Sequence, residues 1–160
     1  MFLYFLRHGD AETDPSVPGE NHSLSDDGIR QIRNIAALIG RLGLRFDAAF
    51  TSPLLRACQS ADIVVGTAQS PSKIVTTEYL IPGSDPQKLF RLLEQQPDSA
   101  HILLVGHEPL LGQLVAFMVA GNLTAEVDMK KGSLCCLEIA RPIKPGSGLL
   151  KWLIPAAAAR

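Results

Sequence analysis

Two histidines and two arginines stand just after short apolar runs of the chain, where strands would end. They are Arg7 and His8 after residues 1–6, Arg56 after residues 48–50, and His107 after residues 102–105. An arginine offers a planar set of five donors that fits phosphate oxygens, and a neutral imidazole nitrogen can attack phosphorus. Open α/β sheets bind their ligands at the carboxyl ends of strands, so these residue types at these places indicate phosphoryl transfer.

Two of these strand ends lead into sequences that begin helices. Ser52 followed by Pro53 predicts a helix N-cap and a first helical residue, which places Arg56 in the early turns. Pro109 similarly suits the opening of a helix just after His107. The free N–H groups and the dipole of a helix N-terminus favour an anion. Ser52 itself is interpreted as a cap rather than as a phosphate contact.

The same residues also allow a structural interpretation. Arg7 and Arg56 could pair with Asp10, Glu78 or Glu108 in an ion-pair network, and a histidine taken alone is more often structural. The joint placement of two histidines and two arginines at strand ends favours a shared phosphate site instead.

Apolar periodicity predicts helices that alternate with strands, which is typical of a three-layer α/β/α fold with a mainly parallel central sheet. The expected strands are residues 2–7, 47–51, 73–77 and 101–106, and the expected helices begin near Ser25, Ser52, Asp85 and Pro109. Residues 134–140 and 149–154 flank a Pro- and Gly-rich segment and predict an antiparallel C-terminal hairpin at a sheet edge. We expect a surface loop near the site over residues 12–22 and a frayed tail over residues 155–160.

Length and composition limit the classes of protein. With 160 residues and 46% hydrophobic composition, the chain is expected to form a single domain over residues 1–160. The 15 Lys and Arg against 16 Asp and Glu give a formal charge of −1, which argues against a partner of nucleic acid. No apolar run approaches the roughly 20 residues of a membrane span, and no secretory leader pattern is present, so a cytoplasmic location is predicted.

The cysteines and histidines give no pattern of a disulfide framework or a metal site. Cys135 and Cys136 are adjacent, and Cys58 lies in an expected helix. We therefore expect reduced thiols and chemistry that needs no metal or other cofactor. A net charge near zero leaves the oligomeric state open.

The residues around the two histidines and the two arginines carry a family resemblance. The chain resembles the histidine phosphatase superfamily, also called phosphoglycerate mutase-like, through Arg7-His8-Gly9, Ser52-Pro53 with Arg56-Ala57 and Gln59, and Gly106-His107. Residues 24–31 are similar to the segment that opens the first helix in that superfamily. The short length and the sequence Arg-His-Gly-Asp-Ala from Arg7 to Ala11 are most similar to the SixA-type phosphohistidine phosphatases.

The resemblance implies a hydrolase that works through an enzyme phosphohistidine. His8 would attack phosphorus, Arg7, Arg56 and His107 would bind the phosphoryl group, and water would then release inorganic phosphate. For this, His8 must be neutral at its attacking nitrogen, and a hydrogen bond from its other ring nitrogen to a backbone carbonyl would fix that tautomer. The implied substrate is phosphohistidine on a phosphorylated histidine-containing domain of a phosphorelay.

Two other functions remain open, and so does the identity of the residue that acts as general acid. A small phosphomonoester could be the substrate of a phosphatase or mutase, or the chain could be a non-catalytic phosphate-binding module. The superfamily implies a carboxylic acid that protonates an ester leaving group. Glu78 is the best positional match, Asp10 is the alternative, and Glu108 is a third candidate.

Two further features concern the surroundings of the site. The stretch between Arg56 and His107 has no room for a long lid, which predicts an open site that could accept a protein-borne phosphate. Lys130 and Lys131 are interpreted as a solvated patch, with contact to a phosphoprotein partner as the alternative.

Overall fold

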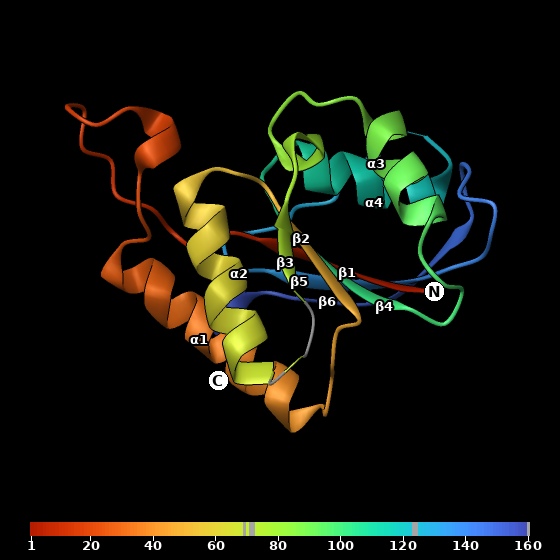
Figure 1. Ribbon diagram of the computed structural model, residues 1–160, viewed down its shortest axis with the longest axis horizontal. Helices are drawn as coiled ribbons and strands as arrows, with labels where there is room; N and C mark the ends of the chain where they lie inside the picture. Colours follow the sequence, from red (N-terminus) through yellow and green to blue (C-terminus); the bar gives the residue numbers. More distant parts are fainter. Residues whose placement is uncertain (69, 71–72, 123–124, 160) are drawn as a thin grey trace.

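The computed structural model describes residues 1–68, 70, 73–122 and 125–159, and its centre is one six-stranded sheet with the order β3-β2-β4-β1-β5-β6 (Figure 1). The strands are β1 (Phe2–Arg7), β2 (Ala48–Thr51), β3 (Ile74–Thr76), β4 (His101–Gly106), β5 (Leu134–Ile139) and β6 (Gly148–Ile154). The first four are mutually parallel where they pair, whereas β5 runs antiparallel to β1 and β6 antiparallel to β5. The mainly parallel sheet and the antiparallel hairpin are therefore confirmed.

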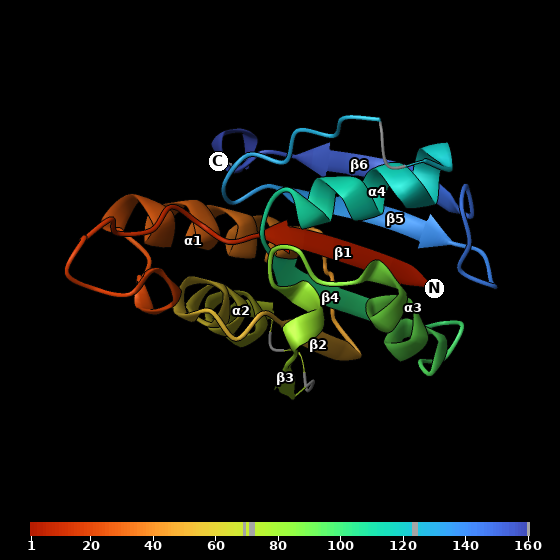
Figure 2. The same cartoon turned by 90° about the horizontal axis from the view of Figure 1, so that it is seen from above.

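In the described part of the chain, four α-helices cover the two faces of this sheet. They are α1 (Asp26–Arg41), α2 (Leu55–Ala68), α3 (Pro86–Glu94) and α4 (Leu110–Ala120). Figure 2 shows α1 and α2 together at one side of the sheet, and the core contacts place α3 and α4 on the opposite face. Short 3₁₀ turns lie at Gly19–Asn21, Glu78–Leu80 and Ala156–Ala158. The arrangement is the three-layer α/β/α fold that the sequence predicts.

The alternation of side chains along β1 builds both layers of the core. Leu3 and Phe5 pack in the core beside α3 and α4, while Tyr4 and Leu6 pack in the core beside α1 and α2. All four are at most 2% exposed. Full burial of one such side chain is worth roughly 1.5–3 kcal/mol, so the strand that ends at Arg7 is held firmly from both faces.

The beginnings of the helices follow the predicted caps with one exception. Ser25 Oγ accepts the N–H of Gly28 at the start of α1, and Asp85 Oδ1 accepts the N–H of Gln87 at the start of α3. The prediction that α2 begins at Pro53 is wrong, since the helix begins at Leu55. The reason is that Ser52 N still donates to Val105 O at 2.9 Å, so strand-like pairing continues beyond β2.

The expected frayed tail is also corrected. Ala156 and Ala159 are 5% and 1% exposed and join the core beside α1 and α2. Arg41 Nη2 donates to Ala159 O at 2.9 Å. Small apolar side chains can pack closely against a helix, and Ala156 and Ala159 do so here, while Ala157 and Ala158 are exposed and residue 160 lies outside the described part of the chain.

The helices were also compared with the length and hydropathy that a bilayer requires. Among the described residues, none of the helices is both long enough and apolar enough to cross a membrane.

Candidate active site

The register of the sheet brings three predicted strand ends together. In the parallel pairing, Arg7 lies opposite Gly106, and Thr51 lies opposite Val105. His8 N continues the pairing of β1 with β4 by donating to Gly106 O at 3.2 Å. The residues that follow these strands are therefore neighbours, and the rings of His8 and His107 lie 4.7 Å apart between centroids.

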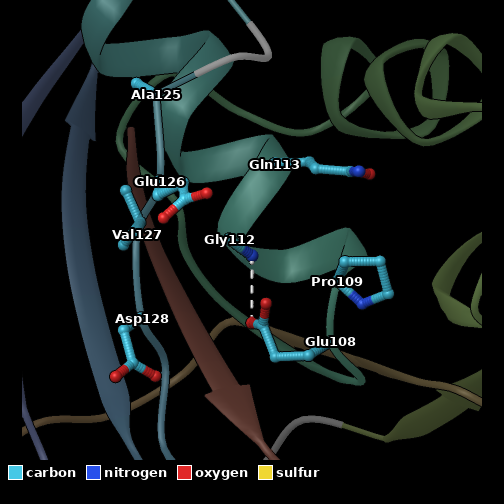
Figure 3. Close-up of a pocket in the computed structure, with 8 residues that line it drawn as sticks. All are labelled: Glu108, Pro109, Gly112, Gln113, Ala125, Glu126, Val127 and Asp128. Carbon is cyan, nitrogen blue, oxygen red and sulfur yellow. Dashed lines mark hydrogen bonds between the residues drawn. The ribbon is translucent and has the colours of Figure 1, made fainter.

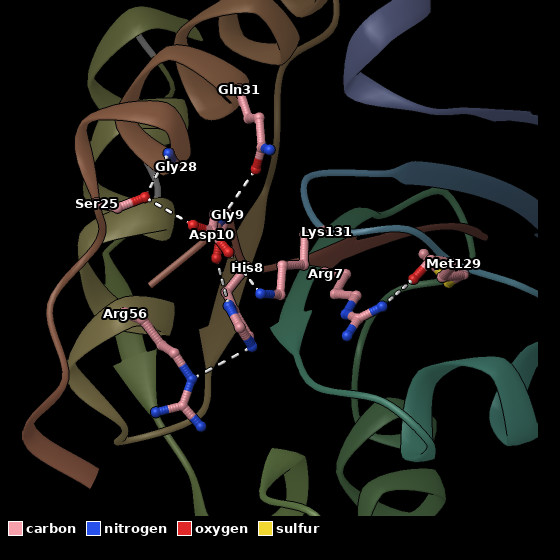
Figure 4. A network of polar contacts seen from close by, with 10 residues as sticks. All are labelled: Arg7, His8, Gly9, Asp10, Ser25, Gly28, Gln31, Arg56, Met129 and Lys131. Atoms are coloured by element: carbon pink, nitrogen blue, oxygen red, sulfur yellow. Dashed lines mark hydrogen bonds and ion pairs between the residues drawn. The ribbon is translucent and has the colours of Figure 1, made fainter. Parts of the chain in front are cut away.

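The tautomer of His8 is fixed by its own backbone. His8 Nδ1 lies 2.6 Å from Gly9 O, and because a carbonyl oxygen can only accept, Nδ1 carries the proton. In the neutral ring this leaves the lone pair on Nε2, which accepts a hydrogen bond from Arg56 Nε at 3.3 Å (Figure 4). The predicted bond to a backbone carbonyl is thus present, and it is made to Gly9.

The two arginines reach the site from opposite sides and are held by backbone carbonyls. Arg56 Nη1 donates to Gly19 O, and Arg7 Nη1 donates to Met129 O, each at 2.7 Å. Among the hydrogen bonds and ion pairs of the described residues, neither arginine pairs with Asp10, Glu78 or Glu108, which was the structural interpretation of the sequence. Arg7 Nε is buried without a hydrogen-bond partner among the described residues.

Helix α2 is tied to the loop that carries the first histidine. The Ser60 hydroxyl donates to Arg56 O at 2.7 Å and accepts the N–H of Gly9 at 3.3 Å. Ser60 therefore fixes the distance between the helix that bears Arg56 and the backbone beside His8.

His107 is oriented by a residue that sequence reasoning assigned to another role. Its Nε2 lies 2.8 Å from Ser52 Oγ, while its Nδ1 is buried without a partner in the described part of the chain. Ser52 Oγ also accepts the N–H of Leu54 at 3.3 Å. The hydroxyl that was expected mainly to cap a helix therefore also holds the second histidine, and its position at a strand end was the signal that could have indicated this.

Burial and positive charge keep both imidazoles neutral. The pKa of His8 is lowered to about 4, first by burial and then by the charges of Arg56, Arg7 and Lys131, despite its bond to Gly9. The pKa of His107 is lowered to about 3, again first by burial. Both rings are thus uncharged at neutral pH, each with one nitrogen free of a proton, as a nitrogen nucleophile requires.

His8 opens onto a hollow of about 500 Å³ at the protein surface. Its lining includes Arg56, Lys131 and parts of the loop over residues 12–22, which confirms that this loop borders the site. Arg7 and His107 do not line the hollow, and His107 is only 2% exposed beside His8. The accessible part of the site therefore consists of His8 and the positively charged side chains of Arg56 and Lys131.

The two neighbouring lysines are both exposed, as expected, but they have different partners. Lys130 Nζ pairs with Asp128 at 2.5 Å, and both side chains are mostly exposed. Lys131 Nζ instead pairs with Asp10 Oδ1 at 2.5 Å and lines the hollow beside His8. Sequence reasoning missed Lys131 because nothing local indicates that this turn returns to the end of β1.

The three candidate acids lie in different surroundings. Both Asp10 oxygens accept hydrogen bonds, Oδ1 from Lys131 and Oδ2 from Ser25, and the bond to Lys131 lowers the pKa of Asp10. Burial raises the pKa of Glu108, whose Oε1 accepts the N–H of Gly112 in a separate hollow of about 410 Å³ (Figure 3).

Glu78 is exposed and lines a third hollow, which shares Glu20 and Leu54 with the one at His8. Of the three candidates, Asp10 alone forms an ion pair within the described part of the chain, and Glu78 alone lines a hollow that shares residues with that of His8. Glu78 is thus the acid candidate with the most suitable surroundings.

Potential metal ligands are dispersed in the part of the chain that the structure describes. Over residues 1–68, 70, 73–122 and 125–159, no three His, Cys, Asp or Glu side chains gather closely enough to hold a metal ion. Cys58, Cys135 and Cys136 are free thiols.

Comparisons with known proteins agree with this geometry. The family model of the histidine phosphatase superfamily (branch 1) matches residues 3–81. An uncharacterized protein of Picosynechococcus sp. is 33% identical over 139 residues, which cover 84% of this chain and 82% of the relative. The phosphohistidine phosphatase SixA of Escherichia coli is 28% identical over 124 residues, which cover 76% of each chain.

The fold itself has a solved counterpart. The structure of the protein histidine phosphatase SixA complexed with tungstate superposes with a TM-score of 0.89 and covers 100% of both chains at 23% identity. At that level of identity the likeness speaks for the fold, and the sequence matches speak for the family. The chain belongs to the histidine phosphatase superfamily.

Proposed function

We propose that this chain is a protein phosphohistidine phosphatase that works through phosphorylated His8 and needs no metal ion. The observation that carries the proposal is the state of His8, whose Nδ1–H is bound to Gly9 O and whose Nε2 lone pair is next to Arg56 at an open hollow. A fixed, neutral imidazole whose Nε2 is unprotonated can attack phosphorus once Arg56 Nε turns from that nitrogen to a phosphoryl oxygen.

The reaction has two displacements at phosphorus. His8 Nε2 forms a bond to phosphorus while the P–N bond of the substrate breaks, and the departing imidazole nitrogen takes up a proton from solvent, which the water that attacks in the second step returns. Water then attacks the same phosphorus, the bond to His8 Nε2 breaks, and inorganic phosphate leaves. His8 keeps its Nδ1 proton throughout, because Gly9 O holds it.

Positive groups offset the charge of the transferring oxygens. Arg56 lies at His8 Nε2, and Arg7 lies one residue away on the same strand end. His107 Nδ1 and Arg7 Nε are buried and have no partner among the described residues, so both can donate to an oxyanion. If Ser52 Oγ–H donates to His107 Nε2, the proton of the neutral ring stands on Nδ1, which makes that nitrogen the donor.

Two features support a phosphate that is carried on a protein. The hollow is bordered by the short loop over residues 12–22 rather than by a long lid, so a folded carrier can approach His8. The similarity to the phosphohistidine phosphatase SixA of Escherichia coli over 76% of both chains supports the same substrate class. A phosphohistidine also needs little acid help, since its nitrogen leaving group is readily protonated.

The decisive experiment follows phosphate release from a phosphorylated histidine-containing transfer domain in the presence of EDTA. The wild-type protein should release phosphate and carry acid-labile label on His8 after brief exposure, while His8→Ala should do neither. His22→Asn is the matched control, because His22 lines the same hollow but its Nε2 is bonded to Asp14 O and Val17 O. Release by His8→Ala, or release only without EDTA, would overturn the proposal.

A small phosphomonoester is the second candidate, and the position of Glu78 favours it. This carboxyl lies in a hollow that adjoins the one at His8, where it could protonate an ester oxygen. Glu78→Gln should then lower turnover of an ester such as phosphoserine far more than turnover of phosphoramidate. High turnover of one ester by the wild-type protein, with none on phosphohistidine, would favour this candidate over the first.

A further inference from the structure

The turn over residues 129–132 is fastened to the strand end that bears the nucleophile. Met129 O accepts Arg7 Nη1 at 2.7 Å, and Gly132 N donates to both Arg7 O at 3.1 Å and His8 O at 3.0 Å. The turn is closed by Ser133 N, which donates to Lys130 O at 2.8 Å. Lys131 therefore stands in the middle of a segment whose backbone is fixed relative to His8.

Gly132 explains why this turn has one conformation. Its φ of +73° is a backbone conformation that L side chains rarely adopt. A Cβ there would also lie 3.1 Å from the Cβ atoms of Ala156 and Gln31. The close packing of this glycine holds the base of the Lys131 side chain in place.

The ammonium group of Lys131 is held at the edge of the hollow by one carboxylate. Its Nζ lies 2.5 Å from Asp10 Oδ1, and its side chain is 45% exposed. Asp10 is held from two other directions, because its Oδ2 accepts Ser25 Oγ–H and its backbone N donates to Gln31 Oε1 (Figure 4). Asp10 is thus the fixed partner of the pair, and the four-carbon stem of the lysine is the part that can move.

We propose that Lys131 is a substrate-contacting residue, whose ammonium leaves Asp10 to bind a phosphoryl oxygen at His8, and that Asp10 is its resting partner, which competes with the substrate for it. The inference rests on the proposed function, which it extends by one residue. A transferring phosphoryl group spreads its charge over three oxygens. Arg7, Arg56 and Lys131 come from three different segments of the chain; Arg56 bonds to His8, Lys131 lines its hollow, and the charge of Arg7 is close enough to lower the pKa of His8.

Lys130 provides a matched control one residue away. It stands on the same turn and pairs with Asp128, but it does not line the hollow at His8. Orthovanadate is the probe, since it resembles the transferring phosphoryl group without needing a carrier. Lys131→Met should weaken vanadate binding about tenfold and raise KM for phosphoramidate, whereas Lys130→Met should change either value less than twofold. Exposed ion pairs contribute little to stability, so both variants should unfold at nearly the wild-type temperature.

Asp10→Asn separates a contact with substrate from a purely structural ion pair. If Lys131 binds the oxyanion, removal of the competing carboxylate should tighten vanadate binding about threefold, which is opposite in sign to the effect of Lys131→Met. Weaker binding in both variants, with no further loss in the double variant, would show that the pair acts only on structure and would overturn the inference.

The test also distinguishes the inference from the proposed function on which it rests. Equal vanadate affinity in wild-type protein and Lys131→Met would overturn the role of Lys131 alone. Failure of the wild-type protein to bind vanadate, together with the absence of label on His8, would overturn both proposals.

Discussion

His101 and His107 lie at opposite ends of strand β4 and illustrate what each end of the sheet offers. His101 opens the strand, where its ring stacks on Phe2 at 4.9 Å and its Nδ1 lies 2.9 Å from Tyr4 OH. His107 follows the other end, where it lies beside His8 and its pKa is lowered first by burial and then by the charges of His8, Arg56 and Arg7.

The difference arises from the direction of the strands rather than from the residue type. Because β1, β2 and β4 run parallel, the segments that leave them meet at one edge and bring residues from distant parts of the chain together. At the opposite edge, His101 joins the packing of Phe2 and Tyr4 from the neighbouring strand. The same side chain is therefore a packing element at one end of β4 and a candidate phosphate ligand at the other.

The largest expected effect comes from making the same substitution at His107 and at His101. His107→Asn removes the unpartnered Nδ1 donor, and loss of one donor to a developing anion typically lowers turnover about 10²–10³-fold. His101→Asn should change kcat/KM less than twofold, and loss of the Tyr4 bond should lower the free energy of unfolding by about 1 kcal/mol. Measurements of phosphate release and of urea unfolding for both variants check this, and equal losses of turnover would contradict the comparison.

The second prediction concerns the backbone that supports the site end of β1. A Cβ on Gly28 would lie 1.9 Å from Asp10 O, so Gly28→Ala must displace either α1 or the segment that follows His8. We expect it to lower the free energy of unfolding by about 3 kcal/mol and to impair phosphate release. Gly40→Ala, on the same helix with nothing within 4 Å, should instead stabilise the protein by about 0.5–1 kcal/mol. Urea unfolding of the two variants measures both effects, and similar values would show that the close approach is not required.

The sequence predicts the strands that lead to the candidate site better than it predicts the side-chain contacts within that site. Residues 2–7 and 101–106 were predicted to the residue, because continuous apolar runs end there at polar residues. The proximity of His8 and His107 then followed because the carboxyl ends of parallel strands lie at the same edge of a sheet. These features depend on local pattern and on one property of α/β sheets.

The role of Lys131 depends on pairing between distant segments, which no local pattern reveals. Only the antiparallel pairing of β5 with β1, with Leu134 opposite Leu6, brings the turn before β5 to the end of β1. The packing of Ala156 and Ala159 was missed for the same reason, since a run of alanines does not indicate which distant core residues it will contact. The missing information was which segments far apart in the sequence pair or pack together, rather than the chemistry of the side chains.

The third prediction uses the lowered pKa of His107. In the unfolded chain this histidine binds its proton near pH 6.5, whereas in the folded protein it does so only near pH 3. The unfolded state therefore binds more protons between these values, and stability falls as the pH is lowered. From pH 7 to pH 5 this histidine should contribute a loss of about 2 kcal/mol at 1.36 kcal/mol per pKa unit.

Urea unfolding at the two pH values measures that contribution by difference. His107→Asn should lose about 2 kcal/mol less than the wild-type protein over the same interval. An equal pH dependence in the two proteins would mean that His107 titrates alike in the folded and unfolded chains, and the electrostatic contrast between the ends of β4 would then lose its support.

The smallest expected effect concerns the residue that orients His107. Ser52→Ala removes the hydroxyl that lies 2.8 Å from His107 Nε2, while the donor nitrogen itself remains. Without that partner the ring can adopt the other tautomer and lose the proton on Nδ1. We expect kcat/KM to fall about tenfold, which corresponds to about 1.4 kcal/mol, and the ¹⁵N shifts of His107 to show a mixture of tautomers. Thr67→Ala is the control, because its hydroxyl bonds only within α2, to Ile63 O. A tenfold loss of turnover without a change of tautomer would mean that Ser52 contacts the phosphoryl group itself.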